Sequence, residues 1–221
     1  MTGAYITVLR TIIGTLVSLV ANALLAFIVS RKRFLFRSQL SLFWVITMYV
    51  NGGMIPTFLV YRGFHLTGTF WVYIVPGAVS AFNMLVMRTY MLGLPDSLEE
   101  SAQLDGAGYF TIFTRIISPL CKPVYATVAL FVAVGQWNSW FDAYLFTNSQ
   151  SLKTMQSILV EILNQYQSSS ANQAANQASQ TITPDSIRMA ATMVATIPII
   201  MVYPFIQKYF VKGIMLGSVK S

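Results

Sequence analysis

The feature that most constrains the fold is a series of long apolar runs. A run of about 18 or more apolar residues is long enough to cross a bilayer as a helix. The runs cover about residues 5–30, 38–61, 70–92, 123–146 and 189–206. They predict an all-α membrane protein with five transmembrane helices, forming a single transmembrane domain over residues 1–221.

The composition supports a membrane location. The chain is 55% hydrophobic and only 10% charged, whereas a soluble domain carries about 25% charged residues. Its net charge of +7 comes from basic residues spread between the apolar runs. This distribution indicates contact with membrane lipid and argues against nucleic acid as a partner. The single cysteine, Cys121, excludes an internal disulfide, and His65 has no second ligand nearby. We therefore predict no metal site.

The basic residues also predict the orientation of the chain. Cytoplasmic loops of membrane proteins carry an excess of lysine and arginine. The block at residues 31–37 and the loop at residues 94–122 are therefore expected inside, with residues 147–188 forming a long outer loop. Arg10 is among the few basic residues left outside or near the outer face. This orientation places the amino terminus outside, so we expect a further span upstream of it.

The outer loop divides into two parts. Apolar residues recur at helical spacing in its first part, which predicts a short amphipathic helix; they are Leu152, Met155, Leu159, Ile162 and Tyr166. The second part, residues 168–183, reads SSSANQAANQASQTIT and is nearly free of bulky apolar side chains. We expect this low-complexity part to be mobile.

The stretch LPDSLEESAQLDGAGYFTIFTRIISP, residues 94–119, concentrates acid in a chain that otherwise avoids it. Four of the seven acidic residues lie within it: Asp96, Glu99, Glu100 and Asp105. Ser97 with Glu100 fits a capping box, and Gly106 and Gly108 are suited to end a short helix. We predict a cytoplasmic helix–turn–helix here that is too short and too polar to span. On local chemistry alone, a solvated loop remains an alternative.

The same stretch resembles a known signature. Glu100-Ser101-Ala102, three residues, Gly106, nine residues, Ile116, one residue and Ser118-Pro119 follow one another here. This resembles the "EAA" signature of ABC-importer permeases, which reads Glu-Ala-Ala, three residues, Gly, nine residues, Ile, one residue and Leu-Pro. Two serines differ from that pattern, at the second and at the penultimate position.

The resemblance implies a role for this stretch. In that family it forms the coupling helix, which docks into a cleft of the ATP-hydrolysing subunit. We expect small residues to permit close approach and carboxylates to pair with basic groups of the partner. The residues expected to couple to the ATPase are Glu99, Glu100, Ser101, Ala102, Asp105, Gly106, Ala107, Ile116 and Pro119.

The chain lacks a G-x-x-x-x-G-K-[ST] phosphate loop. We therefore expect this chain to bind no cofactor and to have no catalytic residue, with ATP and magnesium held by a separate subunit. A permease subunit that is not itself an enzyme fits this expectation.

The resemblance extends to most of the chain. GQWNSWFDAYLF at residues 135–146 and YPFIQKYFVKGIMLGSVK at residues 203–220 look like the carbohydrate-uptake branch of these permeases. They look most like the group serving oligosaccharides of plant or algal polysaccharides, including the alginate importer. Those permeases carry six spans, so the first is expected to be missing here.

That family also implies partners and a location. We expect a second homologous permease subunit, two ATP-binding subunits and an extracytoplasmic solute-binding protein, towards which residues 147–188 would reach. The location implied is the bacterial cytoplasmic (inner) membrane, crossed several times. Import of a sugar or oligosaccharide would proceed by alternating access.

Polar and aromatic residues in the apolar runs are candidates for the substrate pathway. They are Asn51, Asn83, Gln136, Trp137, Asn138, Trp140, Asp142 and Tyr144. Aromatic faces cover the C–H side of a sugar ring, while amides and carboxylates bind its hydroxyls. An aromatic belt at the outer interface is the alternative for the tryptophans and tyrosine. Asp142 stands out because an ionisable group in a span usually faces a cavity or a partner.

Two candidates have structural alternatives of equal or greater weight. Asn51 precedes Gly52, Gly53 and Pro56, and such a break either lines a pathway or makes a kink that fits neighbouring helices. A single asparagine such as Asn83 more often bonds a neighbouring helix.

Two other functional classes were weighed against the ATP-driven importer. An ion-gradient-driven secondary transporter usually needs intramembrane acids or paired broken helices, and only Asp142 qualifies. A membrane enzyme would need a cluster of His, Asp, Glu or Cys, which one histidine and one cysteine do not supply.

Overall fold

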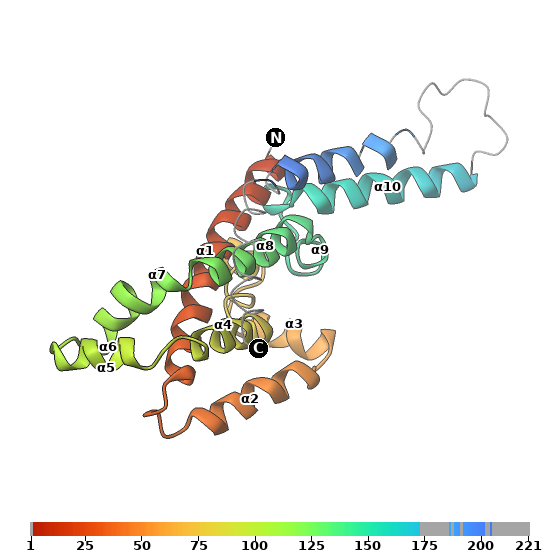
Figure 1. Cartoon of the computed structure of the whole chain (residues 1–221). Helices are drawn as coiled ribbons and strands as arrows, with labels where there is room; N and C mark the ends of the chain where they lie inside the picture. The colour runs from red at the N-terminus through yellow and green to blue at the C-terminus, as the bar shows by residue number, and fades with distance from the viewer. Residues whose placement is uncertain (1, 173–185, 187, 191, 202–203, 205–221) are drawn as a thin grey trace.

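The computed structural model describes residues 2–172, 186, 188–190, 192–201 and 204. Every regular element in this part of the chain is helical, so the all-α prediction is confirmed (Figure 1). The centre of the fold is α1, Thr2–Ser30, against which α4, Ala81–Leu92, and α8, Lys122–Asn138, pack. The apolar run of α1 ends directly before Arg31.

The main core lies where the carboxyl-terminal half of α1 meets α4, α8 and the acid-rich stretch. Its buried members are Ala23, Ala26, Phe27, Met84, Met87, Met91, Ala102, Ile112, Ile117, Cys121, Val124 and Val128. The methionines all come from α4, and their flexible side chains fill irregular space between helices. The acid-rich stretch is therefore packed against the transmembrane helices through its apolar residues.

The second expected span is not one helix. It consists of α2, Arg37–Tyr49, and α3, Met54–Gly63, which are bent by 119° relative to each other. Gly53 takes a φ of 84° at the bend, and its N–H donates to Oδ1 of Asn51 at 2.9 Å. Neither helix buries a residue in the described part of the chain. The break predicted within residues 38–61 is therefore a sharp turn between two helices.

The third expected span is only partly helical. A single 3₁₀ turn, η1, Phe70–Tyr73, is followed by irregular chain up to α4, which has 12 residues. Asn22 of α1 supports the irregular part: its Nδ2 donates to the carbonyl of Ala78 at 3.1 Å, and its Oδ1 accepts from the N–H of Ser80 at 3.0 Å. Irregular backbone inside a membrane protein needs such internal partners.

The fourth expected span is broken near its outer end. Helix α8 ends at Asn138, and α9, Phe141–Phe146, follows after Ser139 and Trp140. Before α8, the helical stretch Tyr109–Leu120 lies at 80° to it. That stretch comprises α6, Tyr109–Thr111, the π-helical turn η2, Ile112–Ile117, and α7, Ser118–Leu120.

A last helix covers Arg188–Met201, apart from residue 191. The end of the fifth expected span, and all of the motif at residues 203–220 except Pro204, lie outside the described residues. Within the described residues, α1 alone is long and apolar enough to cross a membrane unbent. Counting α2–α3 and the bent helices at 109–138 as broken spans raises that number to three.

The outer loop contains the expected helix. After η3, Gln150–Leu152, helix α10 runs over Met155–Asn172. It begins against the amino-terminal end of α1, where the N–H of Met155 donates to Oγ1 of Thr7 at 2.9 Å. In Figure 1, α10 projects from this end of α1, whereas α5, Ser97–Leu104, lies near the opposite end. Residues 173–183 of the low-complexity part, which we expected to be mobile, lie outside the described residues.

Candidate functional site

The short helix α5 has a well-defined end. The N–H of Ala107 donates to the carbonyl of Ala102 at 2.9 Å, and that of Gly106 donates to Gln103 at 3.0 Å. With a φ of 79° at Gly106, these two bonds form a Schellman motif. A Cβ on Gly106 would meet nothing within 4 Å. The left-handed backbone, and not a lack of space, is therefore what favours glycine here.

The start of α5 differs from the capping-box prediction. Asp96 precedes the helix, but no side chain caps it. The N–H groups of Glu99 and Glu100 both donate to the backbone carbonyl of Asp96, each at 3.0 Å. The capping box of Ser97 and Glu100 is therefore wrong. The acidic side chains of this first turn do not cap the helix and are therefore available to bind other groups.

Two of those acids are bound by residues directly after the carboxyl-terminal end of α1. Arg31 forms an ion pair with Glu99, and its guanidinium lies 4.9 Å from the ring centroid of Phe27. Lys32 pairs with Asp96, and its hydrogen bond lowers the pKa of that carboxyl group. Within this chain, Arg31 is the partner of Glu99, and the expectation that Glu99 contacts a partner subunit stays a prediction.

The remaining residues expected to couple to the ATPase fall on two faces. Ala102 is buried in the core, and Ala107 and Ile116 pack against the same cluster. The others are exposed: Glu100, Ser101, Asp105, Gly106 and, on α7, Pro119. Within the described residues, neither Glu100 nor Asp105 makes an ion pair. One face of α5 thus holds the helix in place and the other is presented to solvent.

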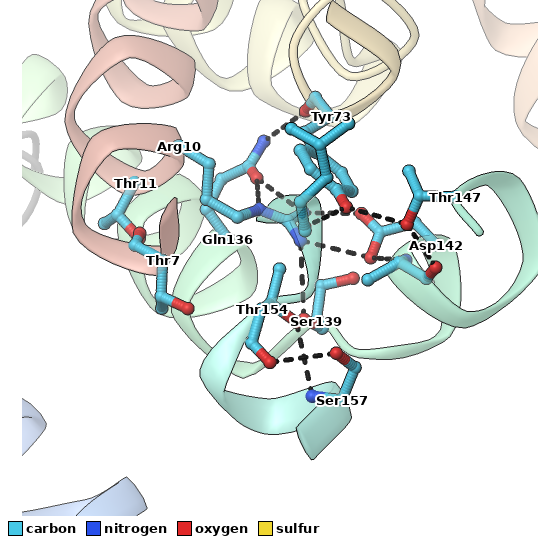
Figure 2. Close-up of polar contacts among 12 residues, drawn as sticks. Thr7, Arg10, Thr11, Tyr73, Gln136, Ser139, Asp142, Thr147, Thr154 and Ser157 are labelled. Atoms are coloured by element: carbon cyan, nitrogen blue, oxygen red, sulfur yellow. Dashed lines mark hydrogen bonds and ion pairs between the residues drawn. The ribbon is translucent and has the colours of Figure 1, made fainter. Parts of the chain in front are cut away.

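The opposite end of α1 holds a buried polar network, shown in Figure 2. The side chain of Arg10 is almost fully buried and makes a bidentate ion pair with Asp142 of α9, with Nη1 donating to Oδ1 at 3.1 Å. Its Nε and Nη2 also donate to Oε1 of Gln136 at 3.0 and 2.8 Å. Arg10 therefore joins α1 to both sides of the break between α8 and α9.

Tyr73 completes this network. The guanidinium of Arg10 lies 4.4 Å from the centroid of its ring, and Nε2 of Gln136 donates to its backbone carbonyl at 3.2 Å. Its hydroxyl donates to the carbonyl of Leu152 at 2.7 Å and lies 3.3 Å from Oγ1 of Thr147. The buried charge of Arg10 is therefore neutralised and fully hydrogen-bonded, as a charge inside a membrane protein requires.

The sequence contained a signal for Arg10 that the prediction missed. Arg10 is the only charged residue of the first apolar run before Arg31, and Asp142 is the only acid of the fourth. An unpaired charge inside a span raises the free energy of the folded protein, so two such charges are expected to form an ion pair with each other. Gly14, one turn further along α1, makes room for this pairing: a Cβ there would lie 2.9 Å from Nε2 of Gln136.

The other residues predicted for the substrate pathway do not gather in one place. Nε1 of Trp137 donates to the carbonyl of Ala195 at 3.1 Å, so Trp137 contacts the last described helix. Asn138 is exposed and donates to the carbonyl of Val134 in its own helix. Asn83 is buried in the first turn of α4, and Asn51 belongs to the exposed bend between α2 and α3.

Two hollows remain near the outer end of α1. A cleft of about 290 Å³ lies beside the polar network and is lined by Arg10, Gln136 and Asp142 among others. A larger open groove of about 990 Å³ is lined by Trp140 and Tyr144 of α9 and by residues of α10. No group of three His, Cys, Asp or Glu side chains that could hold a metal ion occurs in the part of the chain that the structure describes.

Comparison with known proteins gives consistent results. The family described as "Binding-protein-dependent transport system inner membrane component" matches residues 12–216. The chain is 40% identical over 216 residues to the polygalacturonan/rhamnogalacturonan transport system permease protein YtcP of Bacillus subtilis (strain 168), covering 98% of this chain and 76% of that protein. It is 38% identical to protein LplC of the same organism, covering 98% and 73%.

A solved structure also matches. It is the crystal structure of a bacterial ABC transporter involved in the import of the acidic polysaccharide alginate. The superposition has a TM-score of 0.81 with 29% sequence identity, covering 95% of this chain and 74% of the matched chain.

Proposed function

This chain belongs to the family of binding-protein-dependent transport system inner membrane components, and from that membership we propose that it is the permease subunit of an ATP-driven importer of sugars or oligosaccharides. It is a membrane protein and a transport component, not an enzyme in its own right. The similar proteins named for polygalacturonan, rhamnogalacturonan and alginate support a carbohydrate as its cargo.

The observation that carries the coupling role is the presentation of α5. Its inner face is held by Ala102 in the core and by Arg31 on Glu99. Its outer face offers Glu100, Ser101 and the glycine turn at Gly106 to solvent. A short helix fixed on one side and bare on the other is suited to receive a soluble subunit. We infer that this subunit is the ATPase, which would hold ATP and magnesium.

The complete importer would contain this chain, a second homologous permease, two ATP-binding subunits and an extracytoplasmic solute-binding protein. ATP binding would close the cytoplasmic side and open the outer side, so that the sugar passes by alternating access. The complex would lie in the bacterial cytoplasmic membrane.

The ion-gradient alternative loses support from the structure. It relied on Asp142 as the intramembrane acid that could carry a proton or a cation. Asp142 is engaged by both Nη atoms of Arg10, so its charge is already compensated. The small cleft beside it therefore has no free acid to serve as an ion site within the described residues.

The coupling role is tested by comparing two glycines of the same stretch. Asparagine and aspartate tolerate the left-handed backbone that Gly106 adopts, so Gly106→Asn and Gly106→Asp add bulk while keeping the end of α5. Gly108 is also exposed, with a φ of −73° and nothing within 4 Å of a Cβ, so Gly108→Asn is the matched control. We expect both Gly106 variants to lower ATP-dependent uptake by at least about tenfold, equivalent to ~1.4 kcal/mol of docking free energy.

Uptake of labelled oligosaccharide and recovery of the ATPase in a mild-detergent pull-down are the measurements. Gly108→Asn should retain both, and all variants should reach the membrane in normal amounts. Normal uptake by a well-expressed Gly106→Asp variant would exclude α5 as the docking helix. Recovery of the parent chain alone, without an ATPase, would exclude the ATP-driven importer.

A further inference from the structure

The outer groove, defined by Trp140, Tyr144, Asn148, Lys153, Ser157 and Glu161, has an aromatic wall. Trp140 and Tyr144 lie one helical turn apart at α9, with ring centroids 6.3 Å apart and an interplanar angle of 56°. Tyr144 is 73% exposed and Trp140 38% exposed. Two large rings are therefore presented side by side on the outer part of the molecule, without being covered by the described chain.

The facing wall of the outer groove is polar. Ser157 and Glu161 lie one helical turn apart on the same face of α10. Lys153 lies two residues before this helix begins. Lys153 and Glu161 form an ion pair across this face. The wall therefore offers a cation, an anion and a hydroxyl within about two helical turns.

This combination decides against lipid acyl chains as the occupant, because placing Lys153 and Glu161 against them would be costly. A sugar ring fits both walls. Its slightly positive C–H face suits the negative face of an aromatic ring, and its hydroxyls both donate to and accept from a wall that contains all three polar side chains.

The volume of the outer groove and the charges that line it limit the class of sugar that would fit. The outer groove has a volume of about 990 Å³, near the upper end of the range of about 300–1,000 Å³ for small-molecule sites. It suits several linked sugar units better than one. Lys153 is the cation lining it, and an ammonium group has three donors, of which Glu161 takes one. The others remain for a carboxylate of a sugar acid.

We propose that the outer groove is a binding site for acidic oligosaccharides, in which sugar units stack on Trp140 and Tyr144 while a uronate carboxylate contacts Lys153. The proposal rests on the proposed function, because it assumes that carbohydrate reaches this face. It adds a residue-level site and a charge preference. Helix α9 carries both this aromatic wall and Asp142, so the site adjoins the Arg10 network.

Direct binding to the chain tests the site. The probes are trigalacturonate and its neutral counterpart galactotriose, added to the protein in nanodiscs without a solute-binding protein. We expect saturable binding of trigalacturonate, weakened by about tenfold in Tyr144→Ala and retained in Tyr144→Phe, which keeps the ring. Trp71→Ala is the control, because Trp71 is likewise an exposed aromatic residue but lies on η1 outside the groove.

The charge preference has its own variant. Lys153→Gln should weaken trigalacturonate binding to the level of galactotriose and leave galactotriose binding unchanged. Equal binding of both sugars by the parent chain would overturn the acidic preference.

Two results would overturn the site itself: no saturable binding of either sugar to the parent chain, or parental affinity in Tyr144→Ala. A Tyr144→Ala variant that loses only stimulation of ATP hydrolysis by a solute-binding protein would do the same, since the groove would then be a protein-docking surface. Sugar binding is measured on this chain whether or not an ATPase co-purifies. Failure of the site is therefore separate from failure of the importer.

Discussion

The two ends of α1 are attached to distant parts of the chain by charge pairs, but the pairs differ in their surroundings. At the outer end, the side chains of Arg10 and Asp142 are 2% and 24% exposed, and Arg10 has further partners in Gln136 and Tyr73. At the cytoplasmic end, Arg31 and Glu99 are 12% and 15% exposed, whereas Lys32 and Asp96 are 68% and 57% exposed. Arg10 is the most buried of the three cations, and the Lys32–Asp96 pair is the most exposed of the three pairs. The Arg31–Glu99 pair is about as buried as the Arg10–Asp142 pair, but its cation is more exposed than Arg10.

This difference in burial implies that the ion pair between α1 and α9 is harder to break than the ion pairs between the end of α1 and α5. Removing one member of a buried ion pair typically costs about 3–5 kcal/mol, because the other charge stays buried without a partner. Exposed pairs contribute about 0–1 kcal/mol. The outer pair therefore fixes α9 to α1 in the folded state. Of the two inner pairs, Lys32–Asp96 is of this exposed kind, and Arg31–Glu99, whose cation is less buried than Arg10, is expected to be intermediate. A weaker attachment of this kind would suit the docking role proposed for α5.

The largest expected effect is that of Asp142→Ala. It leaves Arg10 buried without its carboxylate and should lower the free energy of unfolding by about 3 kcal/mol. Thermal unfolding of the purified chain in detergent, followed by circular dichroism, measures the change. The double variant Arg10→Met/Asp142→Leu removes both charges and should be clearly more stable than the single variant. If Asp142→Ala unfolds at the parental temperature, the outer pair is not the stronger attachment.

An intermediate effect is expected for Glu99→Gln. The variant loses the partly buried pair with Arg31 and should release α5 locally, by about 1 kcal/mol. Hydrogen exchange of the amides of α5 should become about fivefold faster, with little change in the unfolding temperature of the whole chain. Glu100→Gln is the matched control, because Glu100 is next to Glu99 in the sequence but is exposed and makes no ion pair in the described structure. Equal acceleration in both variants would show that Arg31 does not hold α5.

The smallest effect is expected for Lys32→Gln. Its pair with Asp96 is exposed, so the unfolding temperature at pH 7 should not change measurably. Lys32 lowers the pKa of Asp96 in the folded chain, so any contribution is present above the ordinary carboxyl pKa and is lost as pH falls through the lowered value. Carboxyl titration by NMR should show the pKa of Asp96 returning towards its ordinary range in the variant. If Lys32→Gln lost as much stability as Asp142→Ala, the exposed inner pair would not be weaker than the buried outer pair.

Local signals in the sequence predicted the parts of the fold that depend on neighbouring residues. The end of α5 at Gly106 follows from its backbone requirement, and the break after Asn51 follows from the two glycines. The capping box failed because a competing local pattern occurs instead. The backbone carbonyls of Pro95 and Asp96 already accept from the amides of Leu98, Glu99 and Glu100.

Features that depend on distant residues were not predictable from periodicity. The irregular chain before α4 exists because Asn22 of α1 bonds Ala78 and Ser80, 56 and 58 residues away. Arg10 and Asp142 are separated by 132 positions. An apolar run indicates that a segment is buried. It does not indicate where the segment stops being helical, or which polar groups of a distant segment then bind its backbone. The residues that line the outer groove were not predictable for the same reason, because one wall comes from α9 and the other from α10.

The separation between Arg10 and Asp142 has a consequence for biosynthesis. Arg10 leaves the ribosome 132 residues ahead of the acid that neutralises it, so α1 enters the bilayer with an uncompensated cation. Until α9 is made, the long side chain must extend towards the headgroups to keep its charge hydrated. Insertion of the first helix and its final burial are thus separate events in time. A chain cut short before Asp142 would keep an unpaired arginine, so it should fold less stably and be cleared faster by chaperones and proteases than the complete chain.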